Sequence, residues 1–277
     1  MYPYFEDLFK YYCAKSHQNG AKILITQHGY DNIFKHDDWG VNKVFSKTQL
    51  SWGENNKKNL KNFIFTKIYK PKKVRFRFYN NRRILIILYA FSEMENQPPD
   101  GYNGNYSINV RIYKSTLNFL NKTSKNLINL IDLKAIQVTK FPILENSIRK
   151  KYQDIKFISI KKKFSRVINN YNVSIHFYLG TPFFESVYLN RPTVLVLDQK
   201  VQLEFDSKFK FFIKKMIKNK IIFENPSSAV SFINKNYDNL EDWWNSQKNQ
   251  RLLDQFCKVY CKRSTNLKLE LKRIFKK

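Results

Sequence analysis

The feature that most constrains the fold of this chain is a regular alternation of short apolar runs and helix-sized segments over residues 80–225. Strands are predicted over Arg83–Phe91, Lys134–Thr139, Ile155–Ile160, Val173–Phe177 and Thr193–Leu197. Parallel strands need long crossover connections, so this pattern is typical of βαβ units. We therefore predict an α/β fold with a Rossmann-like, doubly wound parallel sheet that helices cover on both faces.

The residues on either side of this region follow other patterns. The sequence predicts a helix over Tyr4–Lys15, a strand over Ala21–Thr26, and helices from Pro226 to the end. Residues 54–73 are rich in Lys and Asn and contain Pro71, a composition that suits a connector. We place a domain boundary near residue 70, which divides the chain into residues 1–70 and 71–277.

The charge of the chain points to an anionic partner without naming one. Fifty basic and 22 acidic residues give a net charge of +28, which would suit nucleic acid, phosphate ligands or a membrane surface. The basic residues are mostly lysines, and Asn, Ile, Phe and Tyr are also abundant. An AT-rich genome encodes such a mixture without any selection for binding, and this explanation is the simpler one.

The cysteines and the lengths of the apolar runs indicate where in the cell the protein is located. Cys13, Cys257 and Cys261 form neither a disulfide framework nor a metal-ligand spacing. The amino-terminal residues do not resemble a signal peptide, and the longest apolar run, Ile84–Phe91, is too short to cross a bilayer. We expect a cytoplasmic protein, soluble or peripheral to the membrane.

Glycine-rich phosphate-binding motifs are absent from the sequence. It contains no GxGxxG, GxxxxGK[ST], GxSxG or HExxH motif, and only 7 glycines in total. These absences argue against NAD enzymes, P-loop NTPases, α/β-hydrolases and zincins.

The turn Leu179–Glu185 is the most informative candidate site, because doubly wound sheets bind ligands beyond the carboxyl ends of their strands. Thr181 suits the N-cap and Pro182 the first position of a helix. Free N–H groups there would favour a phosphate, and Gly180 would let it approach the backbone. Glu185 lies one position beyond the capping-box partner and could accept hydrogen bonds from a ribose. An ordinary capped helix with a solvated Glu185 explains the motif equally well.

Three other turns carry candidate residues. His28, next to Gly29 at the end of a predicted strand, could serve as a general base near neutral pH. Lys140 is placed to neutralise a phosphate, and Ser92 could cap a helix or contact a ligand. A lone His is more often a packing or surface residue, and a Lys in so basic a chain is often simply solvated. Ser92 fits a helix cap as well as it fits a ligand contact.

Four ordered segments resemble a family of transferases encoded in bacterial surface-polysaccharide loci. That family is similar to GT-B glycosyltransferases and distantly to the CDP-glycerol glycerophosphotransferases. The segments are Gln27–Gly29, Ser51–Gly53, Gly180–Val194, and Tyr237–Asn245 with the following Phe256–Cys257. The resemblance spans residues 20–262.

This resemblance implies a two-lobed GT-B enzyme. Residues 71–277 would form the lobe that binds a nucleotide-activated donor, and residues 1–70 a remnant of an amino-terminally truncated acceptor lobe. Family members have a larger first lobe, and their equivalent of Gln27–Gly29 usually continues with further glycines. Here Tyr30 follows instead.

The resemblance also implies roles for individual residues. The turn at Gly180 and Thr181 would hold the donor phosphates and Glu185 the ribose. His28 would be the catalytic base, and Lys140 would neutralise the leaving diphosphate. No metal or other cofactor is expected, because helix dipoles and basic side chains can stabilise the leaving group.

Three hypotheses about function remain open. The first is a glycosyl- or related group transferase that uses a nucleotide-activated donor and a saccharide or lipid-linked acceptor in surface-polysaccharide biosynthesis, with an anionic membrane as a further candidate partner. The second is a non-catalytic module that binds such a donor. The third is a basic nucleic-acid-binding protein, which the absence of a recognisable nucleic-acid motif argues against.

Overall fold

The computed structural model describes residues 7–26, 48–53, 60–62, 75–78, 82–89, 106–135, 143–197 and 205–262, together with Leu269 and Lys272. The chain divides into two compact units: residues 1–72 with 255–277, and residues 73–254. The division lies close to the expected boundary near residue 70, and residues 255–277 group with the first unit. The roles of the units as acceptor and donor lobes stay a prediction.

The first unit contains a small parallel sheet. Helix α1 (Asp7–Gln18) precedes strand β1 (Leu24–Thr26), so the helix and the strand expected near the amino terminus are confirmed. Strands β2 (Thr48–Ser51) and β3 (Leu60–Asn62) complete a sheet of order β1-β2-β3.

In the first unit, the resemblance segment Ser51–Gly53 contacts residues that lie a few positions after the segment Phe256–Cys257. The backbone N–H of Lys262 donates a hydrogen bond of 2.7 Å to the carbonyl of Trp52. A Cβ atom on Gly53 would overlap the carbonyl group of Val259, near the end of helix α12 (Gln247–Tyr260). The glycine is therefore required because two backbone segments approach closely there. Trp52 itself is buried.

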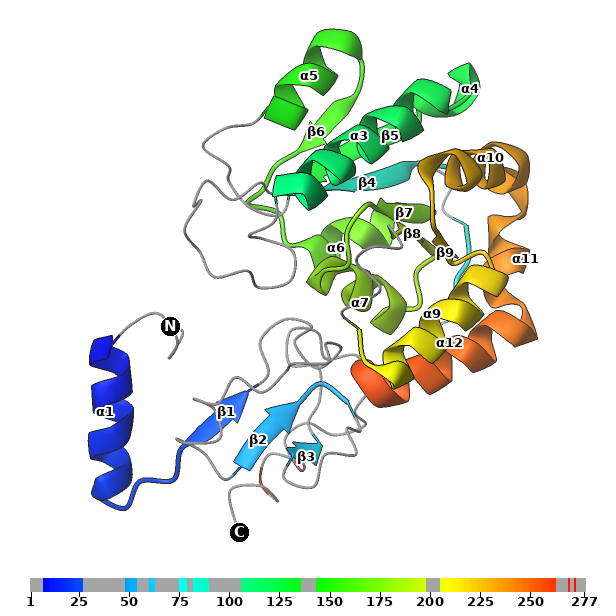
Figure 1. Ribbon diagram of the computed structural model, residues 1–277. Helices are drawn as coiled ribbons and strands as arrows, with labels where there is room; N and C mark the ends of the chain where they lie inside the picture. The colour runs from blue at the N-terminus through cyan, green and yellow to red at the C-terminus, as the bar shows by residue number, and fades with distance from the viewer. Residues whose placement is uncertain are drawn as a thin grey trace. The chain divides into compact units, whose positions relative to one another are not determined.

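The second unit is built on a six-stranded parallel sheet (Figure 1). Its strands are β4 (Ile84–Leu88), β5 (Ile131–Ala135), β6 (Lys156–Ile158), β7 (Val173–His176), β8 (Thr193–Val196) and β9 (Ile222–Phe223). Their order in the sheet is β6-β5-β4-β7-β8-β9. The chain winds outward from β4 in one direction and then from β7 in the other, so the predicted doubly wound α/β sheet is confirmed.

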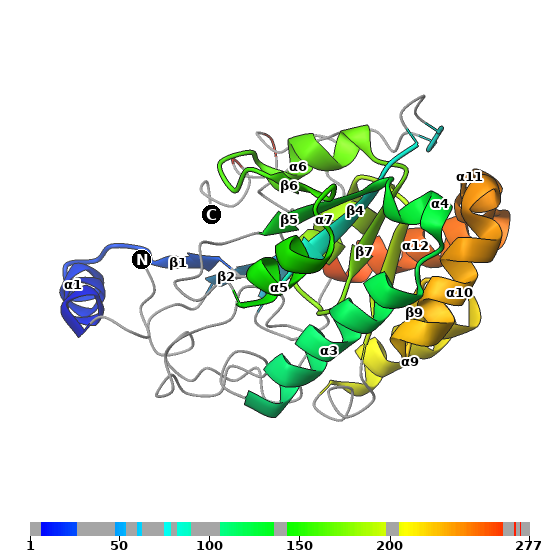
Figure 2. The same ribbon diagram turned by 90° about the horizontal axis from the view of Figure 1, so that it is seen from above.

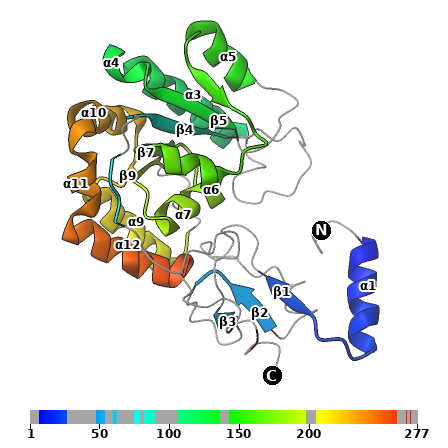
Figure 3. The ribbon, with the colours of Figure 1, turned by 180° about the vertical axis from the view of Figure 1, so that it is seen from behind.

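Helices cover both faces of this sheet (Figures 1 and 3). The helices of the second unit, in chain order, are α3 (Tyr106–Lys122), α4 (Lys125–Ile128), α5 (Ile143–Lys151), α6 (Phe164–Val167), α7 (Thr181–Tyr188), α9 (Ser207–Lys218), α10 (Pro226–Asn236), α11 (Leu240–Asn245) and the first part of α12, with 3-10 turns at Ile168–Asn170 and Tyr237–Asn239. On one face, Phe119 of α3 packs edge-on against Phe177, with 5.5 Å between ring centroids. On the opposite face, His176 packs against Phe164 of α6 and Phe183 of α7.

The two faces of the sheet differ in chemistry. Side chains alternate along a strand, and residues paired in parallel strands share a face. The face under α3 is wholly apolar in the four central strands, with Ile84, Ile86, Leu88, Ile131, Leu133, Ala135, Val173, Ile175, Val194 and Val196. The face under α6 and α7 carries the buried polar residues Asp132, Lys134, Ser174, His176 and Thr193.

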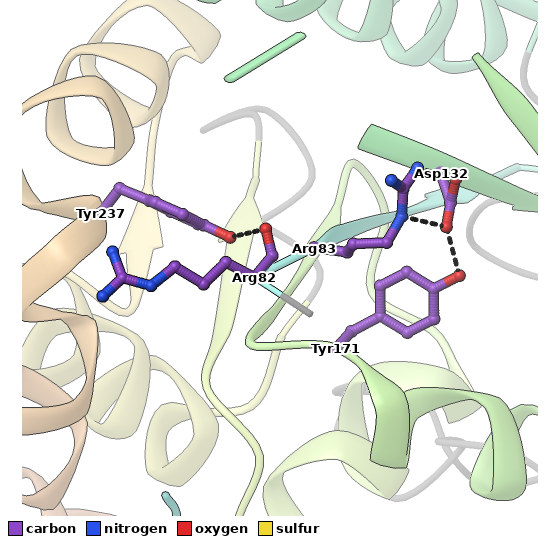
Figure 4. Close-up of polar contacts among 5 residues, drawn as sticks. All are labelled: Arg82, Arg83, Asp132, Tyr171 and Tyr237. Atoms are coloured by element: carbon purple, nitrogen blue, oxygen red, sulfur yellow. Dashed lines mark hydrogen bonds and ion pairs between the residues drawn. The ribbon is translucent and has the colours of Figure 1, made fainter. Parts of the chain in front are cut away.

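Strand β5 begins three residues before the predicted start at Lys134, so that part of the prediction was wrong. Asp132 interrupts the apolar pattern, but its charge is compensated by a residue distant in sequence. Arg83 donates from Nε to Asp132 Oδ2 at 2.8 Å and also from its terminal nitrogen to Oδ1, and the Tyr171 hydroxyl donates at 2.6 Å (Figure 4). Burial and the bond to Asp132 raise the pKa of Tyr171.

The tandem tryptophan segment joins the end of α7 to α11. Trp244 is fully buried, and its Nε1–H donates to Asn190 Oδ1 at 3.0 Å. Asn190 adopts a left-handed backbone conformation, with φ of 54°. Trp243 donates from its indole nitrogen to the Asn219 carbonyl at 3.0 Å. These contacts lie just before the amino ends of β8 and β9, so the tryptophans hold α11 at the edge of the sheet opposite the carboxyl ends of the strands.

Candidate functional site

The candidate site lies where the winding direction of the large sheet reverses. This point is between the carboxyl ends of β4 and β7, the place where doubly wound folds bind ligands. Tyr89 follows β4 and Tyr178 follows β7, and their rings meet edge-to-face with centroids 4.9 Å apart. Both side chains are buried. Burial, the neighbouring Tyr89 and the charge of Glu185 raise the pKa of Tyr178.

The turn after Tyr178 begins helix α7, as expected, but its N-cap is Gly180 and not Thr181. Gly180 is extended (φ −148°, ψ 173°), and its carbonyl accepts a hydrogen bond of 2.9 Å from the Phe183 N–H. The helical bonding pattern therefore starts one residue earlier than predicted. Thr181 and Pro182 become the first and second helical residues, and no side chain caps the helix.

Gly180 also meets a steric requirement. A Cβ atom at this position would lie 2.5 Å from Cε2 of the Tyr178 ring, well inside van der Waals contact. The absence of a side chain lets the tyrosine fold over the start of α7. Among the residues that the structure describes, none accepts a hydrogen bond from the Thr181 N–H. Since Pro182 has no N–H, the first turn offers few backbone donors, and Thr181 supplies one of them.

Glu185 is buried rather than solvated. It is 7% exposed and lies one helical turn after Thr181, on the same side of α7. Its charge reaches Tyr178, as the raised pKa of that tyrosine shows. The alternative in which Glu185 lies in open solvent is therefore wrong.

A polar network fixes α7 on the sheet beneath this turn. The Nε2 of His176 is 3.0 Å from Ser174 Oγ and 3.4 Å from Ser186 Oγ, and Ser186 also donates to the Pro182 carbonyl at 2.8 Å. Thr193 Oγ1 accepts from Ser174 at 3.1 Å. Burial lowers the pKa of His176 to about 3. His176 is therefore neutral near pH 7, and the network positions the helix start without adding charge.

Lys134 is a buried cation near the carboxyl end of β5. Its side chain is on the same sheet face as His176, and it is 1% exposed. The Nζ donates to the Ser159 carbonyl at 3.0 Å. Burial and then the charge of Lys162 lower its pKa. The lysine predicted near the end of this strand is Lys140, which lies outside the described residues.

The structure brings together only some of the predicted site residues. Gly180, Thr181 and Glu185 lie within the first two turns of α7. His28, Ser92 and Lys140 lie outside the described residues, and their roles stay predictions.

Four residues near this site were not predicted from the sequence: Tyr89, Tyr178, His176 and Lys134. The polar residues at alternate positions in Val173–His176 were a usable signal, since they mark one face of a buried strand.

The cluster around Asp132 is not part of this site. Arg83 directly precedes β4 and Tyr171 precedes β7, so the cluster lies at the amino edge of the sheet. At the same edge the Tyr237 hydroxyl donates to the Arg82 carbonyl (Figure 4). These contacts tie the strand starts together at the edge opposite the candidate site.

Within the described ranges, the structure shows no group of three or more His, Cys, Asp or Glu side chains that could hold a metal ion. None of the helices it describes is long and apolar enough to cross a membrane.

Comparison with protein families decides the membership of the chain. Residues 3–275 match the LIC12162 family transferase. The chain belongs to the LIC12162 family of transferases. This membership agrees with the transferase resemblance carried by the four ordered segments. A comparison with curated proteins finds no match.

Solved structures of glycosyltransferases share the fold. TarM has a TM-score of 0.53 and 14% identity over 97% of this chain and 53% of TarM, so the chain spans about half the length of that protein. A variant of TarM from S. aureus, solved with UDP, has a TM-score of 0.51 and 11% identity, over 92% of this chain and 50% of the variant. HepE from Anabaena, solved with UDP and glucose, has a TM-score of 0.55 and 7% identity, over 95% of this chain and 74% of HepE. The chain therefore has the α/β fold of GT-B glycosyltransferases.

Proposed function

We propose that this chain is a GT-B-type transferase that moves a glycosyl or related group from a nucleotide-activated donor in cell-surface polysaccharide biosynthesis. The observation that carries the proposal is the arrangement at the β4–β7 reversal point. There Gly180, Thr181 and the buried Glu185 follow β7, beside the paired rings of Tyr89 and Tyr178. Membership of a transferase family supports it.

The start of α7 suits the diphosphate of a donor. The N–H of Thr181 and the positive end of the helix dipole favour a negative charge, and Gly180 lets a phosphate approach the backbone. The buried carboxylate of Glu185 would accept hydrogen bonds from the vicinal hydroxyls of a ribose. Support for a nucleotide comes from the UDP held by HepE.

Group transfer follows from this placement. An acceptor hydroxyl attacks the donor carbon that carries the diphosphate, and the bond from that carbon to the phosphate oxygen breaks. The nucleoside diphosphate leaves with both electrons, and its added negative charge develops next to the start of α7, where the helix dipole stabilises it. His28 is our candidate for the base that accepts the hydroxyl proton, and Lys140 for a cation beside the diphosphate.

A nucleotide panel tests the proposal. Calorimetry with UDP, CDP, GDP and the corresponding nucleotide sugars should detect binding of at least one to the wild-type chain. Glu185→Gln should weaken binding of that nucleotide by at least about tenfold, because it removes a charge-assisted hydrogen bond. Asp154→Asn is the matched control, since Asp154 is exposed and lies next to the amino end of β6. Equal affinities of Glu185→Gln and wild type would remove Glu185 from the site.

The second hypothesis is a module that binds the donor without catalysis. Binding of a nucleotide sugar without release of nucleoside diphosphate, in the presence of a range of saccharide acceptors, would support the module. Turnover would dismiss it.

A further inference from the structure

Helix α9 presents a cationic face to solvent. Lys208, Lys214, Lys215 and Lys218 are exposed and recur at the spacing of one side of the helix. The opposite side is buried in the lobe through Phe209, Phe212, Ile213 and Met216. The inner face of α9 packs against β9, which is an edge strand of the large sheet (Figure 2).

The charge on this face has one sign. No acidic residue occurs between Ser207 and Lys218, and Asp206, just before the helix, is engaged as its N-cap by accepting from the Phe209 N–H at 2.6 Å. In the part of the chain that the structure describes, the four exposed lysines form no ion pair. An external anionic surface would lower the mutual repulsion of these lysines.

An exposed aromatic ring lies in the middle of the lysines. Phe211 is 51% exposed, and Lys215 Nζ lies 4.1 Å from its ring centroid. A face that served only solubility would gain nothing from a phenylalanine there. Helices that lie on membranes combine lysines with an aromatic or aliphatic residue that enters the boundary between headgroups and acyl chains.

We propose that the outward face of α9, formed by Lys208, Phe211, Lys214, Lys215 and Lys218, docks on the surface of an anionic lipid bilayer. The lysines contact phosphate and other acidic headgroup atoms, and the Phe211 ring inserts below them. The alternative partner, single-stranded nucleic acid, is less well matched, because it is bound by grooves in which several aromatic rings stack on successive bases. On α9 one exposed ring stands on a convex helical face. The proposal does not depend on the donor site.

Vesicle binding tests this surface. Wild-type protein should sediment with phosphatidylcholine vesicles that contain about a third phosphatidylglycerol and not with phosphatidylcholine alone, and the binding should weaken as salt is raised. Replacing Lys208, Lys214, Lys215 and Lys218 together by Gln should reduce the partition coefficient by more than about tenfold. The matched control replaces Lys125, Lys150, Lys235 and Lys248 by Gln, which removes the same charge from other exposed positions.

Phe211→Ser separates insertion from simple charge attraction. It should weaken binding several-fold at unchanged net charge, and it should leave the folded structure intact because the ring is half exposed. Nucleotide binding should stay unchanged in both α9 variants, which keeps this test distinct from that of the donor site.

Three outcomes would overturn the proposal. The first is an equal loss of vesicle binding in the α9 variant and in the control variant, since the chain's overall charge would then be responsible. The second is unchanged binding by Phe211→Ser. The third is an oligonucleotide that competes with vesicles and itself requires the four α9 lysines, which would assign this face to nucleic acid.

Discussion

At the scale of single residues, the contact between Gly180 and Tyr178 defines the candidate site most sharply. The tyrosine ring is held from one side by Tyr89 and occupies the space that a side chain at position 180 would need. From the sequence, Gly180 was expected to let a phosphate approach the backbone. The structure adds that the glycine is also needed for packing of its own lobe.

Gly180→Ala should therefore destabilise the protein even without ligand. The new methyl group would overlap the buried Tyr178 ring, which packs against Tyr89, so the free energy of unfolding should fall by about 1–3 kcal/mol. Chemical denaturation of wild type and variant measures the change.

A double-mutant cycle supplies the control for this prediction. In a Tyr178→Ala background the ring is absent, and Gly180→Ala should cost much less. Equal costs in both backgrounds would mean that the alanine acts through the backbone and not through Tyr178.

At the scale of elements, the chemistry of the two sheet faces explains which strands could be predicted from the sequence and which could not. Strands β4, β7 and β8 were predicted because every residue in them is buried and none is Asp, Glu, Lys or Arg. The start of β5 was missed because the partner that compensates Asp132 is Arg83, which no local pattern reveals. Strand β9, of two residues, is too short to produce a period.

The stability of the folded protein should also depend on pH, because His176 is buried on the polar face of the sheet. The groups that face its ring are Ser174, Ser186, Phe164 and Phe183, none of which is charged. Its pKa is lowered from 6.5 to about 3 by burial, so between these values the unfolded chain binds a proton that the folded chain does not. Stability should therefore fall as the pH drops from 6.5 towards 3, by up to about 1.4 kcal/mol per pH unit.

His176→Gln isolates this contribution from those of the carboxylates. The difference in unfolding free energy between wild type and variant, measured by urea denaturation at several pH values, should shrink steadily below pH 6.5. Parallel stability curves for the two proteins would show that His176 does not titrate in this way.

At the scale of the whole molecule, the doubly wound order of the sheet could be predicted in outline from the spacing of apolar runs. The spacing could not show that β4 and β7 are the central pair, because strand order depends on long-range packing. That pairing creates the reversal point, and it places Tyr89 beside Tyr178 across 89 positions of sequence. The candidate site was therefore predictable in its single turn at Gly180 but not in its aromatic half.

Our main proposal is that the diphosphate of a nucleotide-activated donor binds at the start of α7. Hydrogen exchange followed by mass spectrometry, with and without the nucleotide that calorimetry selects, tests it most directly. Exchange should slow in the peptide covering residues 177–189 and stay unchanged at the opposite edge of the sheet, around Arg83 and Tyr171. Unchanged exchange in residues 177–189 under conditions where the nucleotide is bound would contradict it.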